Sequence, residues 1–208
     1  MYTPDVNVID DIDVLHRHIR TYPFGVCSSI VNDDIVVDHL PFMIDETRGD
    51  FGTLMTHVSR KNNIWRNVDR NKRVVVVFQG EQSYISPTWY DDPSHAVPTW
   101  NYAVVHARGL PTVIEDSEWL LRHVSALTDI HETGGSPAWR VADASDVFVE
   151  RLLNAIVGIE IPISSLEGKW KLGQNKSQSD RMAMLDALSF SEKAGAPGMA
   201  KLMAEYVN

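Results

Sequence analysis

Apolar and polar residues alternate differently in the two halves of the chain. In the first half, short apolar segments rich in β-branched residues are separated by polar turns, a pattern typical of strands. Val74–Phe78 is apolar throughout, which predicts a central strand buried on both faces, and Asn32-Asp33-Asp34 indicates a hairpin turn. The expected strands cover residues 25–31, 35–43, 54–58, 74–78, 83–85, 102–107 and a segment that ends at 113–114.

Helical periodicity appears near the start of the chain and again in its second half. A helix is expected from about Asp11 to Tyr22, where Pro23 ends it. The capping-box pattern Ser177-Gln-Ser-Asp180 begins another helix that runs to about Leu188. Further helices are expected over 117–130, 145–156 and 199–206, and residues 157–163 alternate like a strand with one buried face.

These elements predict a mainly β protein of the α+β class, an antiparallel barrel with peripheral helices. The 208 residues suit one barrel domain over 1–190, with inserted helices and a C-terminal helical tail over 191–208. The single cysteine, Cys27, excludes an intramolecular disulfide and is expected to be a small buried hydrophobe.

Charge and hydropathy limit the partners. The formal net charge is −9, which argues against nucleic acid as the main ligand because DNA affinity comes mainly from Lys and Arg on phosphates. A local basic patch could still bind DNA. The sequence has no segment of roughly 20 apolar residues, no signal-peptide profile and no metal-binding motif, so we expect a soluble, cytoplasmic protein without a metal.

The stretch Leu54–Asn62 carries the first candidate chemistry. A predicted strand ends there, and Ser59, Arg60 and Lys61 are expected to begin a helix. A hydroxyl, a guanidinium and an ammonium at a helix N-terminus would suit a phosphate group. The alternative is a Ser N-cap followed by two solvated cations, and the triplet taken alone favours it.

The second stretch is His39-Leu-Pro-Phe-Met43. Pro41 removes a backbone donor, which places this strand at an edge or a kink where a planar ligand could lie. An edge-strand proline beside a partly exposed histidine is the simpler alternative.

Two later stretches carry aromatic, amide and cationic side chains. Trp89, Trp100 and Tyr102 lie in or beside a Pro-rich loop, which either covers the barrel or a subunit interface or forms one wall of a planar-ligand pocket. Lys171 and Gln174 could reach the polar edge of a ligand, or could belong to a solvated hairpin or loop.

Taken together, these motifs resemble a known family. The motifs are His39-Leu-Pro-Phe42, Ser59-Arg60-Lys61, Tyr84-Ile-Ser-Pro-Thr-Trp-Tyr90, Val97-Pro-Thr-Trp-Asn-Tyr102 with His106, and Glu167-Gly-Lys-Trp-Lys-Leu-Gly-Gln-Asn175. In order and spacing they resemble the PaiB-type FMN-binding negative transcriptional regulators. They are also similar to the wider flavin split-barrel group that includes pyridoxamine phosphate oxidases.

The resemblance implies an FMN-binding split β-barrel that forms a homodimer with FMN at the subunit interface. It implies that Ser59, Arg60 and Lys61 hold the FMN phosphate, with the strand-to-Ser spacing one residue off the pattern and His57 in the turn. The isoalloxazine edge would lie near Thr56 and the strand segment of His39, Pro41 and Phe42. Trp89, Trp100, Tyr102, Lys171 and Gln174 would close the site.

Three functions follow from the resemblance. The family label implies a transcriptional regulator, although neither predicted helix over 117–130 or 145–156 presents a basic recognition face. The alternatives are a flavin reductase or oxidase and a haem-binding split barrel. The catalytic residues are not identified, and His57 and His106 are the candidates for proton transfer.

Overall fold

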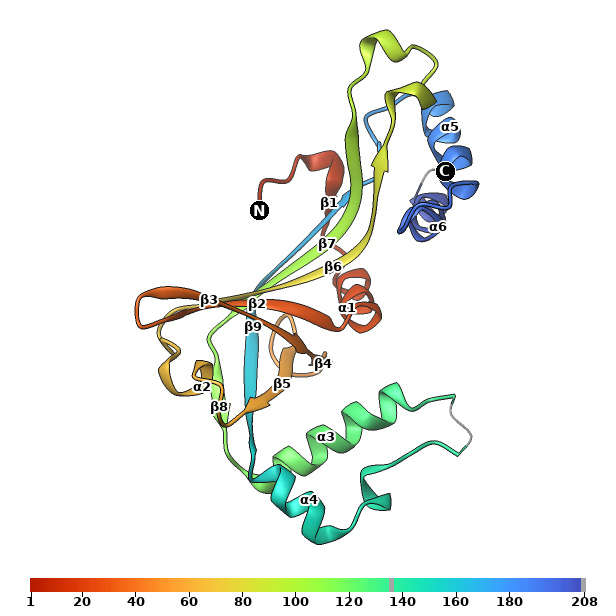
Figure 1. Ribbon diagram of the computed structural model, residues 1–208. Helices are drawn as coiled ribbons and strands as arrows, with labels where there is room; N and C mark the ends of the chain where they lie inside the picture. The colour runs from red at the N-terminus through yellow and green to blue at the C-terminus, as the bar shows by residue number, and fades with distance from the viewer. Residues whose placement is uncertain (135–136, 207–208) are drawn as a thin grey trace. The chain divides into compact units, whose positions relative to one another are not determined.

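The computed structural model describes residues 1–134 and 137–206 (Figure 1). Within them, nine strands and six α-helices are joined by turns and short 3-10 helices. The strands are β1 (Val8–Ile9), β2 (Phe24–Val31), β3 (Asp34–Pro41), β4 (Met43–Asp45), β5 (Thr53–Ser59), β6 (Val74–Ile85), β7 (Thr99–Gly109), β8 (Thr112–Ile114) and β9 (Ile156–Lys171). The helices are α1 (Ile12–Thr21), α2 (Ile64–Asn67), α3 (Ser117–His131), α4 (Asp146–Leu153), α5 (Gln178–Ser189) and α6 (Ala196–Tyr206).

Hydrogen bonds order the strands as β3-β2-β6-β7-β9-β5-β4, and β1 and β8 also pair with β9. The pairs with a defined register, such as β2 with β3 and β5 with β9, run antiparallel. The antiparallel α+β fold predicted from the sequence is therefore confirmed. Over the described residues the order begins at β3 and ends at β4, so the sheet does not close into a ring.

The chain divides into two compact units. The central unit contains Ile19–Val77 and Ala107–Leu166, and the terminal unit contains Met1–His18, Phe78–His106 and the chain from Glu167 onward. Strands β6, β7 and β9 contribute residues to both units. The boundary expected at residue 190 stays a prediction, and α6 belongs to the terminal unit.

In the central unit, β2 and β3 form the predicted hairpin. Its turn residues Asn32 and Asp33 have φ angles of 51° and 66°, which suit the tight turns that join twisted antiparallel strands. Cys27 faces the core, and its burial, with a smaller effect of Asp38, raises the pKa of the thiol to about 12. Cys27 is thus a protonated core side chain. Strand β3 stands at the end of the strand order and ends at Pro41, as the missing donor of proline predicts.

Strand β6 differs from its prediction in two ways. Val74 and Val76 are buried but Val75 and Val77 are only partly covered, so burial on both faces is wrong. The strand also continues to Ile85, because the polar residues in its middle interrupt the hydrophobic pattern but not the ladder. Likewise, β9 runs beyond the predicted 157–163 to Lys171.

In the terminal unit, α5 and α6 lie side by side (Figure 1). Met184 and Leu188 of α5, and Met199 and Met203 of α6, are buried. Helix α6 begins at Ala196, before the predicted start, because Pro197 fits the first turn of a helix. Across the described ranges, none of the helices combines the length and the apolar character that a membrane crossing requires.

The predicted N-cap of α5 gives a test of the terminal unit. The Ser177 hydroxyl accepts the backbone N–H of Asp180 at 3.1 Å. Replacing Ser177 with Ala should lower the free energy of unfolding by about 1 kcal/mol, whereas Ser177→Asn should keep the cap. Urea denaturation of the three proteins measures the difference, and equal midpoints for S177A and the parent would contradict this assignment.

Candidate functional site

The predicted site residues fall into both units. The central unit holds the strand segment with His39, Pro41 and Phe42, and the segment with Thr56, His57, Ser59, Arg60 and Lys61. The terminal unit holds Trp89, Trp100, Tyr102, Lys171 and Gln174. Each group is described within its own unit.

Ser59 is the last residue of β5, and Arg60 and Lys61 form a turn, so the prediction that this segment begins a helix is wrong. The Arg60 N–H donates to the Ala155 carbonyl at 2.9 Å, and the Asn62 N–H donates to the Ser59 carbonyl at 2.9 Å. These bonds close a turn directly after β5. Asn62 then accepts the N–H of Ile64 at 2.9 Å, where the four-residue helix α2 begins.

The turn still presents the donor set that suits a phosphate. The Lys61 side chain and Ser59 are exposed, and the Ser59 hydroxyl accepts the Lys61 N–H at 3.2 Å. Arg60 is partly engaged: its Nη1 donates to Glu115 at 2.6 Å and its Nε donates to the Asn154 carbonyl at 3.0 Å. A guanidinium has five N–H donors, so Arg60 can bind an anion as well. The residues present therefore fit a phosphate group without a helix dipole.

Thr56 and His57 lie on opposite faces of β5, because successive side chains alternate along a strand. Thr56 is 1% exposed, and its hydroxyl donates to the Pro41 carbonyl at 2.7 Å. This bond ties β5 to β3 and uses the hydroxyl proton within the protein. Phe42 is buried beside this junction, and the His39 ring lies 6.3 Å from the ring of Phe24.

His57 belongs to a connected polar cluster that the sequence did not predict. Its Nδ1 lies 3.2 Å from Nε2 of His123 in α3, and the His123 ring is stacked on Trp119 with a centroid distance of 4.9 Å. The Trp119 N–H donates to Glu160 at 2.9 Å. Glu160 in turn accepts two hydrogen bonds of 2.7 Å from the Arg48 guanidinium.

Two signals in the sequence point to this cluster. Trp119 and His123 are four residues apart, which places them on one face of α3. Gly158 stands opposite His57 in the β5–β9 ladder, and a Cβ there would collide with the Trp119 ring. The glycine therefore makes room for the indole that the histidine pair packs against.

Burial and charge set the ionisation of the cluster. Burial, and then the nearby His57, lowers the pKa of His123 to about 4, and burial lowers the pKa of His57 as well. Hydrogen bonds from Arg48 hold the pKa of Glu160 below its usual value. Near neutral pH the two imidazoles are uncharged, and the Arg48–Glu160 pair carries both charges.

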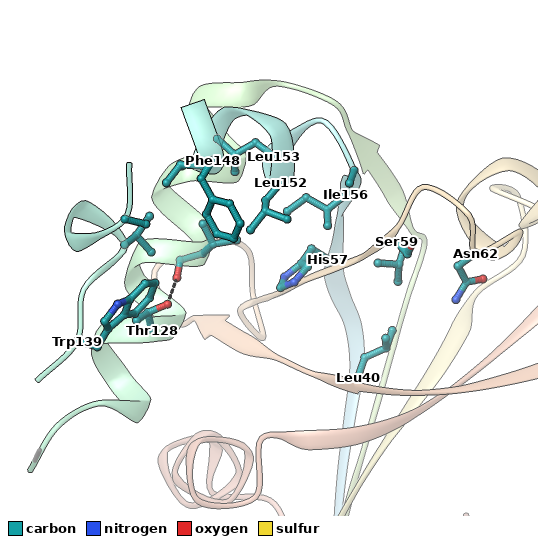
Figure 2. A pocket seen from close by; sticks show the side chains of 16 residues that line it. Leu40, His57, Ser59, Asn62, Thr128, Trp139, Phe148, Leu152, Leu153 and Ile156 are labelled. Atoms are coloured by element: carbon teal, nitrogen blue, oxygen red, sulfur yellow. Dashed lines mark hydrogen bonds between the residues drawn. The ribbon is translucent and has the colours of Figure 1, made fainter. Parts of the chain in front are cut away.

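A pocket of about 580 Å³ lies against His57 and Ser59 (Figure 2). Figure 2 shows His57 projecting toward Phe148 and Leu152 of α4, with Leu40 of β3 across from them. Thr56 faces away from this pocket and lines a space of only about 10 Å³ inside the strands. The structure thus brings His57 and Ser59 together and separates them from Thr56.

In the terminal unit, the predicted ligand-closing residues have protein partners. The Lys171 ammonium donates to the Thr99 hydroxyl, and to the Trp100 carbonyl at 2.8 Å. Gln174 stabilises the turn after β9, since its side chain accepts the Leu172 N–H at 2.8 Å and donates to the Trp170 carbonyl at 2.6 Å.

The aromatic residues differ in their surroundings. The exposed Trp100 meets the Tyr84 ring edge-on at 6.1 Å, and the Lys169 ammonium lies 5.2 Å from the centre of the Tyr102 ring. Trp89 lies in a 3-10 helix after β6. Whether these five residues contact a flavin stays a prediction.

Comparison with known proteins identifies the family. The family model described as "Putative FMN-binding domain" matches residues 1–165. The chain belongs to this family. It is also 27% identical over 205 residues to the protein named "Protease synthase and sporulation protein PAI 2" of Bacillus subtilis (strain 168), which covers 99% of this chain and 97% of that protein. The PaiB-type resemblance is confirmed, and FMN is the cofactor of the family.

Solved structures agree on the fold. The FAD and heme binding protein from Mycobacterium smegmatis aligns with a TM-score of 0.61 at 17% identity, over 85% of this chain and 80% of that chain. The flavocytochrome Anf3 from Azotobacter vinelandii aligns with a TM-score of 0.60 at 14% identity, over 80% of this chain and 70% of that chain. The fold of this FMN-binding-domain protein is that of the flavin split barrels.

The close approach of Trp119 to Gly158 gives a first test of the cluster. Gly158→Ala should displace the indole and lower the free energy of unfolding by about 1–3 kcal/mol, because an overpacked site forces neighbours to move. Urea denaturation measures this loss. Adding Trp119→Leu should relieve part of it, and a double-mutant cycle without coupling would contradict the assignment.

The lowered pKa of His123 predicts how stability depends on pH. Between its ordinary pKa of 6.5 and its folded value of about 4, the unfolded chain binds a proton that the folded chain does not. The free energy of unfolding should therefore fall as pH falls through this window, by up to about 1.4 kcal/mol per pH unit for one such group. His18 of the terminal unit, whose pKa is also lowered to about 4 by burial, contributes with the same sign.

Urea denaturation across this pH range measures the slope. His123→Gln should flatten it by the share of one histidine, and an unchanged slope would show that His123 is not buried in its neutral form.

Proposed function

We propose that the chain is a homodimeric flavoprotein that holds the FMN phosphate in the turn Ser59-Arg60-Lys61. The observation that carries the proposal is the end of β5 and its turn, where an exposed hydroxyl, a partly buried guanidinium and an exposed ammonium stand on three consecutive residues. Hydrogen bonds from charged donors to phosphate are among the strong ones in proteins. The family model, which includes this turn in its match, supplies the identity of the ligand.

The rest of the flavin would lie against β3 and β5. Since the Thr56 hydroxyl donates to Pro41, Thr56 acts here by fixing β5 on β3, and the strand segment of His39, Pro41 and Phe42 supplies the edge. Trp89, Trp100, Tyr102 and Lys171 would close the site from the second copy of the chain. Gln174 also shapes the turn after β9, and would reach the ligand from there.

The homodimer has support from exposed apolar side chains. Ile35 and Val37 on β3 and Trp100 on β7 are each at least half exposed in the single chain. Ile35 and Val37 stand two residues apart on one face of the edge strand β3, and neighbouring exposed apolar side chains of this kind commonly mark protein contacts. Light scattering on the purified protein measures the oligomeric state directly.

The distribution of charge favours flavin chemistry over direct DNA contact. The net charge is −9, and two other cations of the central unit are already paired: Arg20 with Glu46, and Lys72 with Asp33 and Asp69. DNA binding would need such cations for phosphates. Bound FMN supplies one- and two-electron redox chemistry, and the chain supplies binding, orientation and neutral imidazoles. An FMN-dependent oxidoreductase is therefore our first candidate, and a transcriptional regulator is the second.

The phosphate assignment has a direct test. The variant Arg60→Ala with Lys61→Ala should lose FMN on purification while keeping its circular dichroism spectrum, because it removes the anion site and otherwise only two hydrogen bonds at the surface. Arg70→Ala with Arg73→Ala removes two exposed cations from the same unit and should retain the flavin. Flavin absorbance per chain decides the matter, and a fully loaded R60A/K61A protein would refute the assignment.

The activity is tested on the same preparation. Bleaching of the flavin bands by NADH or NADPH supports the oxidoreductase, whereas a salt-sensitive complex with the upstream DNA of its own gene supports the regulator. A Soret band in the absorption spectrum would instead support the haem-binding alternative.

A further inference from the structure

The pocket beside His57 has an unusual lining for a site next to a cationic turn. Its lining side chains come from β3, β5, β9, α3, α4 and the segments next to them, and none is a Lys, Arg, Asp or Glu. Most are aliphatic or aromatic, including Trp139, Phe148 and Leu152. The volume of about 580 Å³ is that of a small-molecule site. A charged molecule would lose its hydration there without gaining a counter-charge.

The polar groups of the lining are mostly engaged by the protein. Asn62 donates to Asp38 at 2.8 Å and accepts from Ile64, and the Thr128 hydroxyl donates to the Val124 carbonyl at 2.7 Å. The Ser59 hydroxyl accepts the Lys61 N–H. His57 has a ring nitrogen left for another partner, because its Nδ1 meets His123 and its Nε2 does not, whereas the further donors of the lining, the Ser59 hydroxyl and the Trp139 indole, belong to exposed residues.

The buried His123 determines which nitrogen of His57 carries the proton. Nδ1 of His123 is buried without a hydrogen-bond partner, and His123 is only 5% exposed. A buried N–H without an acceptor is rarer in proteins than an acceptor that goes unused. The proton of neutral His123 therefore belongs on Nε2, which donates to Nδ1 of His57. His57 then carries its own proton on Nε2 and is a hydrogen-bond donor.

We propose that this pocket binds a neutral, planar, mainly apolar molecule that carries a hydrogen-bond acceptor, such as a carbonyl or a ring nitrogen, and that His57 Nε2–H donates to it. The site adjoins the phosphate turn at Ser59, and its lining contains neither Arg60 nor Lys61. Trp139, Phe148 and Leu152 supply the apolar contact, and the cluster of His123, Trp119 and Glu160 holds the imidazole in orientation.

Quinoline and naphthalene test the proposal, because they have the same shape and only quinoline has an acceptor. Equilibrium dialysis, at a pH where quinoline is neutral, gives their Kd values for the FMN-loaded and the FMN-free protein. His57→Phe should raise the Kd of quinoline by about fivefold to tenfold, which corresponds to the loss of one hydrogen bond, and should leave the Kd of naphthalene within about twofold of its original value. Retained naphthalene binding shows that the pocket itself has survived the substitution.

A matched pair of substitutions tests the location. Leu152 lines the pocket and is 48% exposed, whereas Leu121 of α3 is 41% exposed and does not line it. Leu152→Asp should raise the Kd of both compounds by about tenfold or more, because it places a charge in an apolar lining. Leu121→Asp should leave the Kd of both compounds unchanged.

Three results would overturn the proposal. One is no saturable binding of either compound, and another is equal weakening by L152D and L121D. The third is competition by FMN for quinoline, which would show that the pocket belongs to the flavin ring itself. Loss of the preference for quinoline in H57F, with L152D alone weakening both compounds, supports it.

Discussion

The antiparallel ladder between β5 and β9 is the constraint on which the candidate site depends. Seven residue pairs join the strands, from Thr53 opposite Pro162 to Ser59 opposite Ile156. With this register, the Thr56 side chain points into the buried interior of the central unit, and the His57 side chain lies on the opposite face of β5. It also sets His57 opposite Gly158, where the missing side chain admits the Trp119 ring. The same ladder ends where the cationic turn begins, since the Arg60 N–H continues it by one bond to Ala155.

Two electrostatic environments therefore meet at the end of β5. The turn on one side holds full charges at the surface, where solvent screens them and an anion can approach. The pocket on the other side holds the uncharged imidazole of His57 among apolar side chains, because burial disfavours its protonation. The Arg48–Glu160 ion pair supports the cluster, since Glu160 accepts a hydrogen bond from the Trp119 indole. Neither charged residue of this pair lines the pocket.

Local patterns in the sequence were enough for most elements and for the family. Three features that depend only on residues close in sequence were predicted correctly: the hairpin turn at Asn32-Asp33, the edge position of Pro41 and the cap at Ser177. The ends of β6 and β9 were missed because polar residues within a paired strand hide its continuation. The helix expected at Ser59 was wrong because the backbone bond from Arg60 to Ala155, which closes a turn there, joins residues far apart in sequence. The histidine pair was beyond reach for the same reason, since His57 and His123 belong to different elements.

The alternation of β5 also bears on how this segment can change in evolution. A deletion or insertion of one residue within β5 would exchange its two faces, so Val58 would meet α3 and the imidazole would enter the packed interior. Point substitutions at exposed positions of the turn leave that parity intact. The length of β5 should therefore be as constant among related proteins as the phosphate-binding residues of the turn at its end.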